Sequence, residues 1–335
     1  MAMDTVGDLA RTLILRTHHT RLNRDLDRLG VEIATGFVRD PTAHLGGDVN
    51  GLLAIDRTLA QLETYRVNTT EAGFLTSSMQ TALEEMQNRS EHLSQVLLSS
   101  ELTPTDDMLQ TMSSEAENAL GQVLNGLNRN VGGRFLFSGA ATDRPAIIGA
   151  DAMLTGLRTA LTGQTTAAGV NAALDTWFDG VGGGFDTNAY LGSGTSLSPF
   201  QLSRTETAGI DIRANDQVFR DILKATAKAV LASDPTLALS TDVKVDLLAE
   251  AGQDLITSQE SMVELRASLG TLEARIEETT TRNSAERTAT SIARLDLVGI
   301  DDFETASRYE NTRAQLESLY AITVRSSRMS LTEFL

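Results

Sequence analysis

The sequence of residues 22–41, LNRDLDRLGVEIATGFVRDP, contains a helical repeat and the point at which it ends. The repeat consists of Leu22, Leu26, Leu29 and Ile33. Their spacings of four, three and four place them in one apolar stripe along a helix. The Thr-Gly pair at 35–36 ends the repeat, and Asp40-Pro41 begins a loop. The stripe is narrow, so the helix needs a second helix to cover it.

Proline positions predict where the other long helices lie. The five prolines leave residues 1–40, 42–103 and 236–335 without the strongest helix breaker. The periodic run that ends near Leu102 spans about 55 residues, or about 80 Å as a helix. Thr103 is expected to cap the next helix, with Pro104 in its first turn, and that helix should return antiparallel to the one before it.

The final helix is expected to open at a capping box formed by Asp301 and Glu304. Its predicted buried side consists of Phe303, Ala306, Tyr309, Leu316, Leu319 and Val324. The most economical arrangement is that the two ends of the chain cover one another. We therefore expect a mainly α fold, in which N- and C-terminal segments form a long antiparallel coiled-coil rod.

Residues 131–210 differ from the rest of the chain, because they hold 14 of its 26 glycines. This composition predicts a β-rich or loop-rich insert. The expected domains are terminal coiled-coil helices at 1–40 and 300–335, a helical rod with a β-hairpin at 41–145 and 215–299, and an inserted, outward-facing module at 146–214.

Composition excludes several classes of function. The 335 residues include 45 acidic and 28 basic side chains, for a formal net charge of −17, which disfavours nucleic acid and anionic membranes as partners. The absence of cysteine removes disulfides and thiolate chemistry. With no apolar run of 18 residues and charges throughout the first 30, we expect neither a membrane span nor a cleaved signal peptide.

No motif indicates catalysis, a metal or a cofactor. The four histidines, His18, His19, His44 and His92, make no pattern that would place two ligands on one helical face. The glycine cluster at 180–184 lacks the residues of a phosphate loop and is typical of turns. Only three basic residues are lysine, whereas 25 are arginine. Arginine suits surfaces held between subunits, although a genome rich in G and C would also favour it.

Five segments, taken in order, resemble the flagellin superfamily and more narrowly the hook-associated protein 3 family of the hook–filament junction. They are residues 32–41 (EIATGFVRDP), 59–68 (LAQLETYRVN), 130–139 (NVGGRFLFSG), 266–272 (RASLGTL) and 329–335 (MSLTEFL). The resemblance leaves the middle module unmatched. The loop after Pro41 also lacks the acidic residues that are usual in the family.

The resemblance implies a non-enzymatic structural protein that is extracellular and exported through the flagellar channel without signal cleavage. Its implied partners are other copies in a ring-like layer, flagellin, a hook-side hook-associated protein, and a secretion chaperone with the export apparatus. Alternatives are flagellin itself, a cytosolic coiled-coil scaffold, and an enzyme with its site in the 146–210 module. Detection in sheared flagella would separate the scaffold from the flagellar proteins.

The terminal stripes are expected to be completed only by neighbouring subunits, so that folding and assembly are coupled. We expect Phe135 and Phe137 to pack within the subunit, with a contact to a neighbouring subunit as the alternative. The candidate assembly interface consists of Leu9, Leu13, Leu22, Leu26, Leu29, Phe303, Tyr309, Leu316, Tyr320, Leu331, Phe334 and Leu335.

Overall fold

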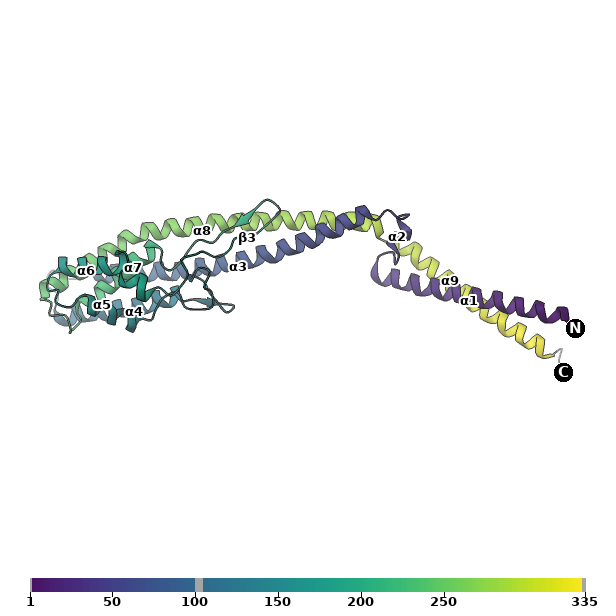
Figure 1. Ribbon diagram of the computed structural model, residues 1–335, viewed down its shortest axis with the longest axis horizontal. Coiled ribbons are helices and arrows are strands. Elements are labelled where there is room, and N and C mark those ends of the chain that lie inside the picture. The colour runs from purple at the N-terminus through teal and green to yellow at the C-terminus, as the bar shows by residue number, and fades with distance from the viewer. Residues whose placement is uncertain (1, 100–104, 333–335) are drawn as a thin grey trace. The chain divides into compact units, whose positions relative to one another are not determined.

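The computed structural model describes residues 2–99 and 105–332, with side chains for residues 10–99 and 105–325. Its elements are mainly α-helices (Figure 1). The chain divides into two compact units. The terminal unit comprises residues 1–63 and 284–335, and the central unit comprises residues 64–283.

The terminal unit is built on two antiparallel helices, α1 (Ala2–Thr35) and α9 (Asp302–Thr332). Contacts run in opposite directions along the two helices, since His19 meets Tyr320 and Gly30 lies beside Tyr309. Helix α1 stops at Gly36, whose φ of 75° suits glycine and confirms the predicted end of the helix. The unit also contains α2 (Pro41–His44), the start of α3 (Asn50–Leu98) and the end of α8 (Thr241–Val298).

The central unit contains most of α3 and α8, which also run antiparallel. Gly73 lies beside Ile276 at one level, and Gly252 lies beside Leu98 at another. A Cβ at position 252 would be 2.8 Å from Leu98 Cγ, so glycine permits the close packing there. Helices α4 (Asp106–Leu127) and α7 (Gln217–Ala232) pack against each other and share one apolar core with α3 and α8.

A short β-hairpin follows α4, as predicted. Strand β1 (Asn130–Val131) pairs antiparallel with β2 (Arg134–Phe135), and both turn glycines have positive φ. Phe137 comes just after the hairpin and is fully buried, with its ring edge-on to Phe219 at a centroid distance of 5.7 Å. The expectation that Phe137 packs within the subunit is confirmed.

Of the two expectations for the glycine-rich segment, β-rich or loop-rich, the second is correct: loops and turns make up most of it, and it contains little β-structure. After the β1–β2 hairpin it contains α5 (Ala150–Ala160), α6 (Ala167–Asp179), the π-helix η1 (Phe185–Ala189) and the two short strands β3 (Phe200–Gln201) and β4 (Thr207–Ala208). Apolar positions in α5 and α6 recur at helical spacing and join the core of the central unit. The glycines lie largely in the connections between these helices. The glycine-rich composition of the whole segment therefore concealed the helical periodicity of α5 and α6.

One local expectation is corrected. Thr105, rather than Thr103, caps α4, since its hydroxyl accepts a hydrogen bond from the backbone N–H of Met108; Thr103 and Pro104 lie outside the described residues.

Two polar side chains of α8, those of Thr279 and Asn283, are buried beneath the β3–β4 hairpin. Asn283 Nδ2 donates to the carbonyl of Leu202 at 2.8 Å, which explains why this position is polar.

An ion pair joins the loop after α7 to α5. The Arg158 guanidinium donates to Asp234 at 2.7 Å, and the Asp234 side chain is 4 % exposed. Burial alone would raise the pKa of Asp234, but hydrogen bonds from Thr236 and Arg158 outweigh burial and lower the pKa below 3.8.

Because the pKa is lowered in the folded state, the carboxylate stabilises the central unit above pH 3.8 and loses this effect as the pH falls further. Asp234→Asn should therefore lower the midpoint of urea unfolding at pH 7. The difference in midpoint between wild type and this variant should become smaller below pH 3.8. Fluorescence of Trp177, the chain's single tryptophan, reports this transition. Asp143→Asn, an exposed carboxylate, is the control; a gap independent of pH would contradict the assignment.

Candidate assembly surface

The terminal seam is the set of residues with which α1 and α9 face each other. In α1 it consists of Leu15, His19, Leu22, Leu26 and Leu29, and in α9 of Thr305, Tyr309, Thr312, Leu316 and Leu319. Both sets follow the alternating spacing of four and three that is typical of coiled coils. Leu22 and Leu29 are the apolar members that are fully buried, at 7 % and 4 % exposure. The others, apart from the buried Thr305, are only half-buried, so the pair makes a thin core.

Polar side chains take part in the seam and weaken it further. Thr305 and Thr312 occupy positions where a coiled coil normally has leucine or isoleucine. His19 Nε2 is 2.8 Å from the Tyr320 hydroxyl, and their rings meet edge-on. The two helices therefore match along their length but bury little apolar surface against each other.

Large apolar side chains around the seam remain exposed. Phe303 is 84 % exposed and Leu13 is 67 % exposed. Ile14, Tyr320, Ile322 and Val324 are each at least half exposed. This corrects the predicted buried side of α9, because Phe303, Ala306 and Val324 point away from α1. The seam instead passes through Thr305 and Thr312, which a search for apolar residues alone does not select.

The predicted interface residues thus fall into three groups. Leu22, Leu26, Leu29, Tyr309 and Leu316 lie in the terminal seam, whereas Leu13, Phe303 and Tyr320 are exposed. Leu9, Leu331, Phe334 and Leu335 lie outside the residues whose side chains the structure describes.

Backbone hydrogen bonds join the residues that follow α1 to the connection between α8 and α9. Val38 N–H donates to the carbonyl of Val298 at 3.0 Å, and Ile300 N–H donates to Gly36 at 3.1 Å. Phe37 and Gly299 thereby form an isolated β-bridge, and the Arg294 guanidinium lies 4.5 Å from the centre of the Phe37 ring. Sequence reasoning missed this contact; Gly36 after α1 and Gly299 after α8 were its only local signals.

The histidine and carboxylate side chains of the described residues are dispersed. Among them, no group of three or more histidine and carboxylate side chains could hold a metal ion. His18 contacts Arg21 and His19 contacts Tyr320, so the adjacent histidines of α1 serve different contacts.

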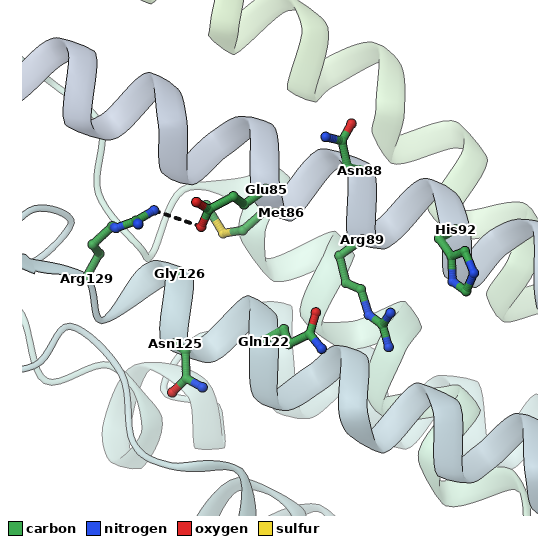
Figure 2. A pocket seen from close by; sticks show the side chains of 9 residues that line it. All are labelled: Glu85, Met86, Asn88, Arg89, His92, Gln122, Asn125, Gly126 and Arg129. Carbon is green, nitrogen blue, oxygen red and sulfur yellow. Dashed lines mark hydrogen bonds and ion pairs between the residues drawn. The ribbon is translucent and has the colours of Figure 1, made fainter.

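An open groove lies between α3 and α4 in the central unit, and sequence reasoning did not single it out. Figure 2 shows its lining: Glu85, Met86, Asn88, Arg89, His92, Gln122, Asn125, Gly126 and Arg129. Arg129 pairs with Glu85 at 2.7 Å, and Arg89 pairs with Glu115 at 2.6 Å. A Cβ at Gly126 would lie 2.9 Å from Met86 Cγ, so this glycine sets the helix spacing. The groove therefore follows from helix packing and paired charges, with no nucleophile beside a base.

None of the described helices is apolar over a stretch long enough to cross a bilayer.

Residues 253–335, most of α8 and all of α9, match the family model of the bacterial flagellin C-terminal helical region. No curated protein matches the chain.

A comparison with solved structures identifies a similar fold. A structure assigned to a flagellar hook-associated protein from Vibrio parahaemolyticus matches 77 % of this chain and 98 % of its own length, with a TM-score of 0.51. The two sequences are 17 % identical over the match, so the comparison concerns the fold. The expected mainly α architecture, with long antiparallel helices and a β-hairpin, is confirmed.

Proposed function

We propose, from the premise that residues 253–335 are a flagellin-type C-terminal helical region, that this chain is a structural subunit of the bacterial flagellum at the hook–filament junction. In this role it is exported, joins other copies in a ring-like layer, and connects a hook-side hook-associated protein to flagellin. A secretion chaperone and the export apparatus are its partners before assembly. No catalytic role is part of the proposal.

The observation that carries the proposal is the thin terminal seam formed by the flagellin-type C-terminal helix and the N-terminal helix. Two fully buried leucines hold the pair together, while Leu13, Phe303 and Val324 face solvent. Burying a large apolar side chain contributes about 1.5–3 kcal/mol, and ordering each residue costs about 1–2 kcal/mol. Neighbouring subunits that cover these residues would thus supply the stability that one subunit lacks.

The proposed arrangement assigns a position to each part of the chain. The helices at 1–40 and 300–335 would form the inner layer, and residues 41–145 and 215–299 the layer around it. The segment 146–214 would face outward. Its two helices, packed on α7 and the rest of the central core, would keep it rigid there.

Localisation tests the proposal directly. An antibody against the central unit should label sheared flagella at one point, the boundary between hook and filament. A strain lacking the gene should make hooks but release flagellin into the medium. Labelling along the whole filament would instead identify the chain as flagellin, and detection only in the cell pellet would indicate a cytosolic scaffold.

A further inference from the structure

One side of α8 in the central unit is exposed over about three helical turns. The α8 ridge consists of the residues Ile256, Glu260, Val263, Glu264 and Ala267. Ile256 and Val263 are 45 % and 54 % exposed, although both side chains are large and apolar. Glu260 and Glu264 make no ion pair with any described residue. The neighbouring Arg266 turns toward α3 and binds Gln87 at 2.6 Å, so the ridge is apolar and acidic.

The groove between α3 and α4 has hydrogen-bond donors that the subunit leaves unused (Figure 2). The amide groups of Asn88, Gln122 and Asn125 make no hydrogen bond with any described residue. Arg89 and Arg129 are each paired with one carboxylate, and because a guanidinium has five N–H groups, both have donors left. The groove is open and has a volume of about 660 Å³, so it can receive side chains of a partner.

Contacts between α3 and α8 determine which of their residues share a level along the helix axes. Gly73 lies beside Ile276, and Leu98 lies beside Gly252, so residue numbers at one level add up to about 350. Asn88, in the middle of the α3 side of the groove, is therefore level with the middle of the α8 ridge. Two parallel copies at the same height would have the ridge of one and the groove of the other at one level.

The ridge and the groove lie on different sides of the central unit and differ in charge. The buried residues Leu255 and Met262 lie on the inner side of α8, opposite the ridge. The lining of the groove includes two arginines but only one carboxylate, that of Glu85. The central unit as a whole carries 28 acidic and 15 basic side chains, a formal −13. An acidic ridge is therefore attracted to this groove in a unit that otherwise repels it.

We infer that the α8 ridge of one subunit docks into the α3–α4 groove of a second copy, which lies parallel to it at the same axial level. This inference rests on the proposed function and names the lateral contact within the ring-like layer. Val263 would pack near Met86, and Glu260 and Glu264 would meet the amide and guanidinium donors. Because the ridge and the groove are different surfaces, the contact is heterologous, and repeated without an axial shift it closes into a ring.

The size of this contact explains why it would form only in the assembly. The ridge is about 18 Å long and a helix about 10 Å wide, so one contact covers on the order of 180 Å² on each subunit. Stable complexes bury about 800 Å² per partner. Two free copies should therefore stay apart, whereas a subunit in the ring makes this contact twice and is also held by its terminal helices.

Chemical cross-linking in assembled flagella tests the contact, because the chain has no cysteine of its own. The test chain carries Asn125→Cys in the groove and Glu264→Cys on the ridge, and flagella sheared from cells that make it are treated with bismaleimidoethane. We expect a ladder of cross-linked dimers and larger oligomers that stops at one largest band, since the ring closes. A cross-link within one chain would stay at the monomer position, and neither single-cysteine chain should form a ladder.

The matched control chain carries Asn125→Cys and Thr281→Cys. Thr281 is exposed on α8, but it lies 17 residues from Glu264, or about 26 Å along the helix. This chain should form no ladder. A ladder from the control chain and none from the test chain would mean that neighbouring copies are shifted along the axis, which would overturn the inference.

Charge reversal on the ridge provides an independent measurement. Glu260→Arg combined with Glu264→Arg should lower the amount of the chain in sheared flagella about tenfold, the size expected when repulsion replaces two weak ion pairs. Asp143→Arg combined with Asp246→Arg changes the net charge equally at exposed positions of the same unit and should be incorporated like wild type. Helical circular dichroism of both variants should match that of wild type, because all four side chains are exposed.

The outcomes separate this inference from the proposed function. Wild type that is missing from sheared flagella would contradict the proposed function. Wild type that is present, with no ladder from the test chain or with normal incorporation of the ridge variant, would overturn the ridge-and-groove contact alone. A ladder without a largest band, or bands in which mass spectrometry finds another flagellar protein, would also overturn it.

Discussion

Leu22→Asp is expected to abolish incorporation of the chain into flagella while leaving its export intact. Leu22 is one of two fully buried apolar side chains in the terminal seam, so aspartate there removes apolar contact and buries a charge. Loss of a buried leucine alone costs about 2–5 kcal/mol, which exceeds what so thin a seam can supply. Leu316→Asp, on the α9 side of the seam, should have the same effect. Immunoblots of sheared flagella and of culture supernatant measure both steps.

Leu13→Asp distinguishes assembly from folding of the single subunit. Leu13 is exposed, so its replacement should leave the helical circular dichroism of the monomer unchanged and still reduce incorporation. Val181→Asp, at a fully exposed position of the central unit, is the matched control and should be incorporated normally. Filaments that contain Leu22→Asp or Leu13→Asp at the level of wild type would refute the assembly surface.

Phe137→Ala should destabilise the central unit more than any other single truncation proposed here. The Phe137 ring is fully buried against Phe219. The backbone carbonyl of Phe137 accepts a hydrogen bond from Ala214 N–H at 2.9 Å. A buried phenylalanine replaced by alanine typically costs about 3–5 kcal/mol. Urea unfolding followed by Trp177 fluorescence should show a lower midpoint with an unchanged slope.

Phe74→Ala provides the comparison, because Phe74 is a mostly exposed aromatic in the same unit. Its removal should change the free energy of unfolding by about 0.5 kcal/mol or less. Equal midpoints for the Phe137 and Phe74 variants would mean that the ring of Phe137 is not part of the core.

Sequence periodicity identifies the buried face of a helix in the core of the central unit, but it does not do so in the candidate assembly surface. In α4 the apolar residues recur at helical spacing on one side of the helix, and this side is the buried face. Helix α9 has few apolar residues distributed around its whole circumference. Phe303 and Val324 fit a helical stripe in the sequence as well as Tyr309 and Leu316 do, yet they face solvent. Only the position of α1 selects between the two faces.

What the sequence by itself determined is local: where helices begin and end, the stop at Thr35-Gly36, and the turn at Gly132-Gly133. These features depend on side-chain periodicity and on backbone conformations that glycine adopts at low cost, and both act over a few residues. The tertiary structure alone decided which side of α9 meets α1 and how α5 and α6 join the core. Those outcomes depend on residues up to 300 positions apart in the chain, and no local pattern encodes such a contact.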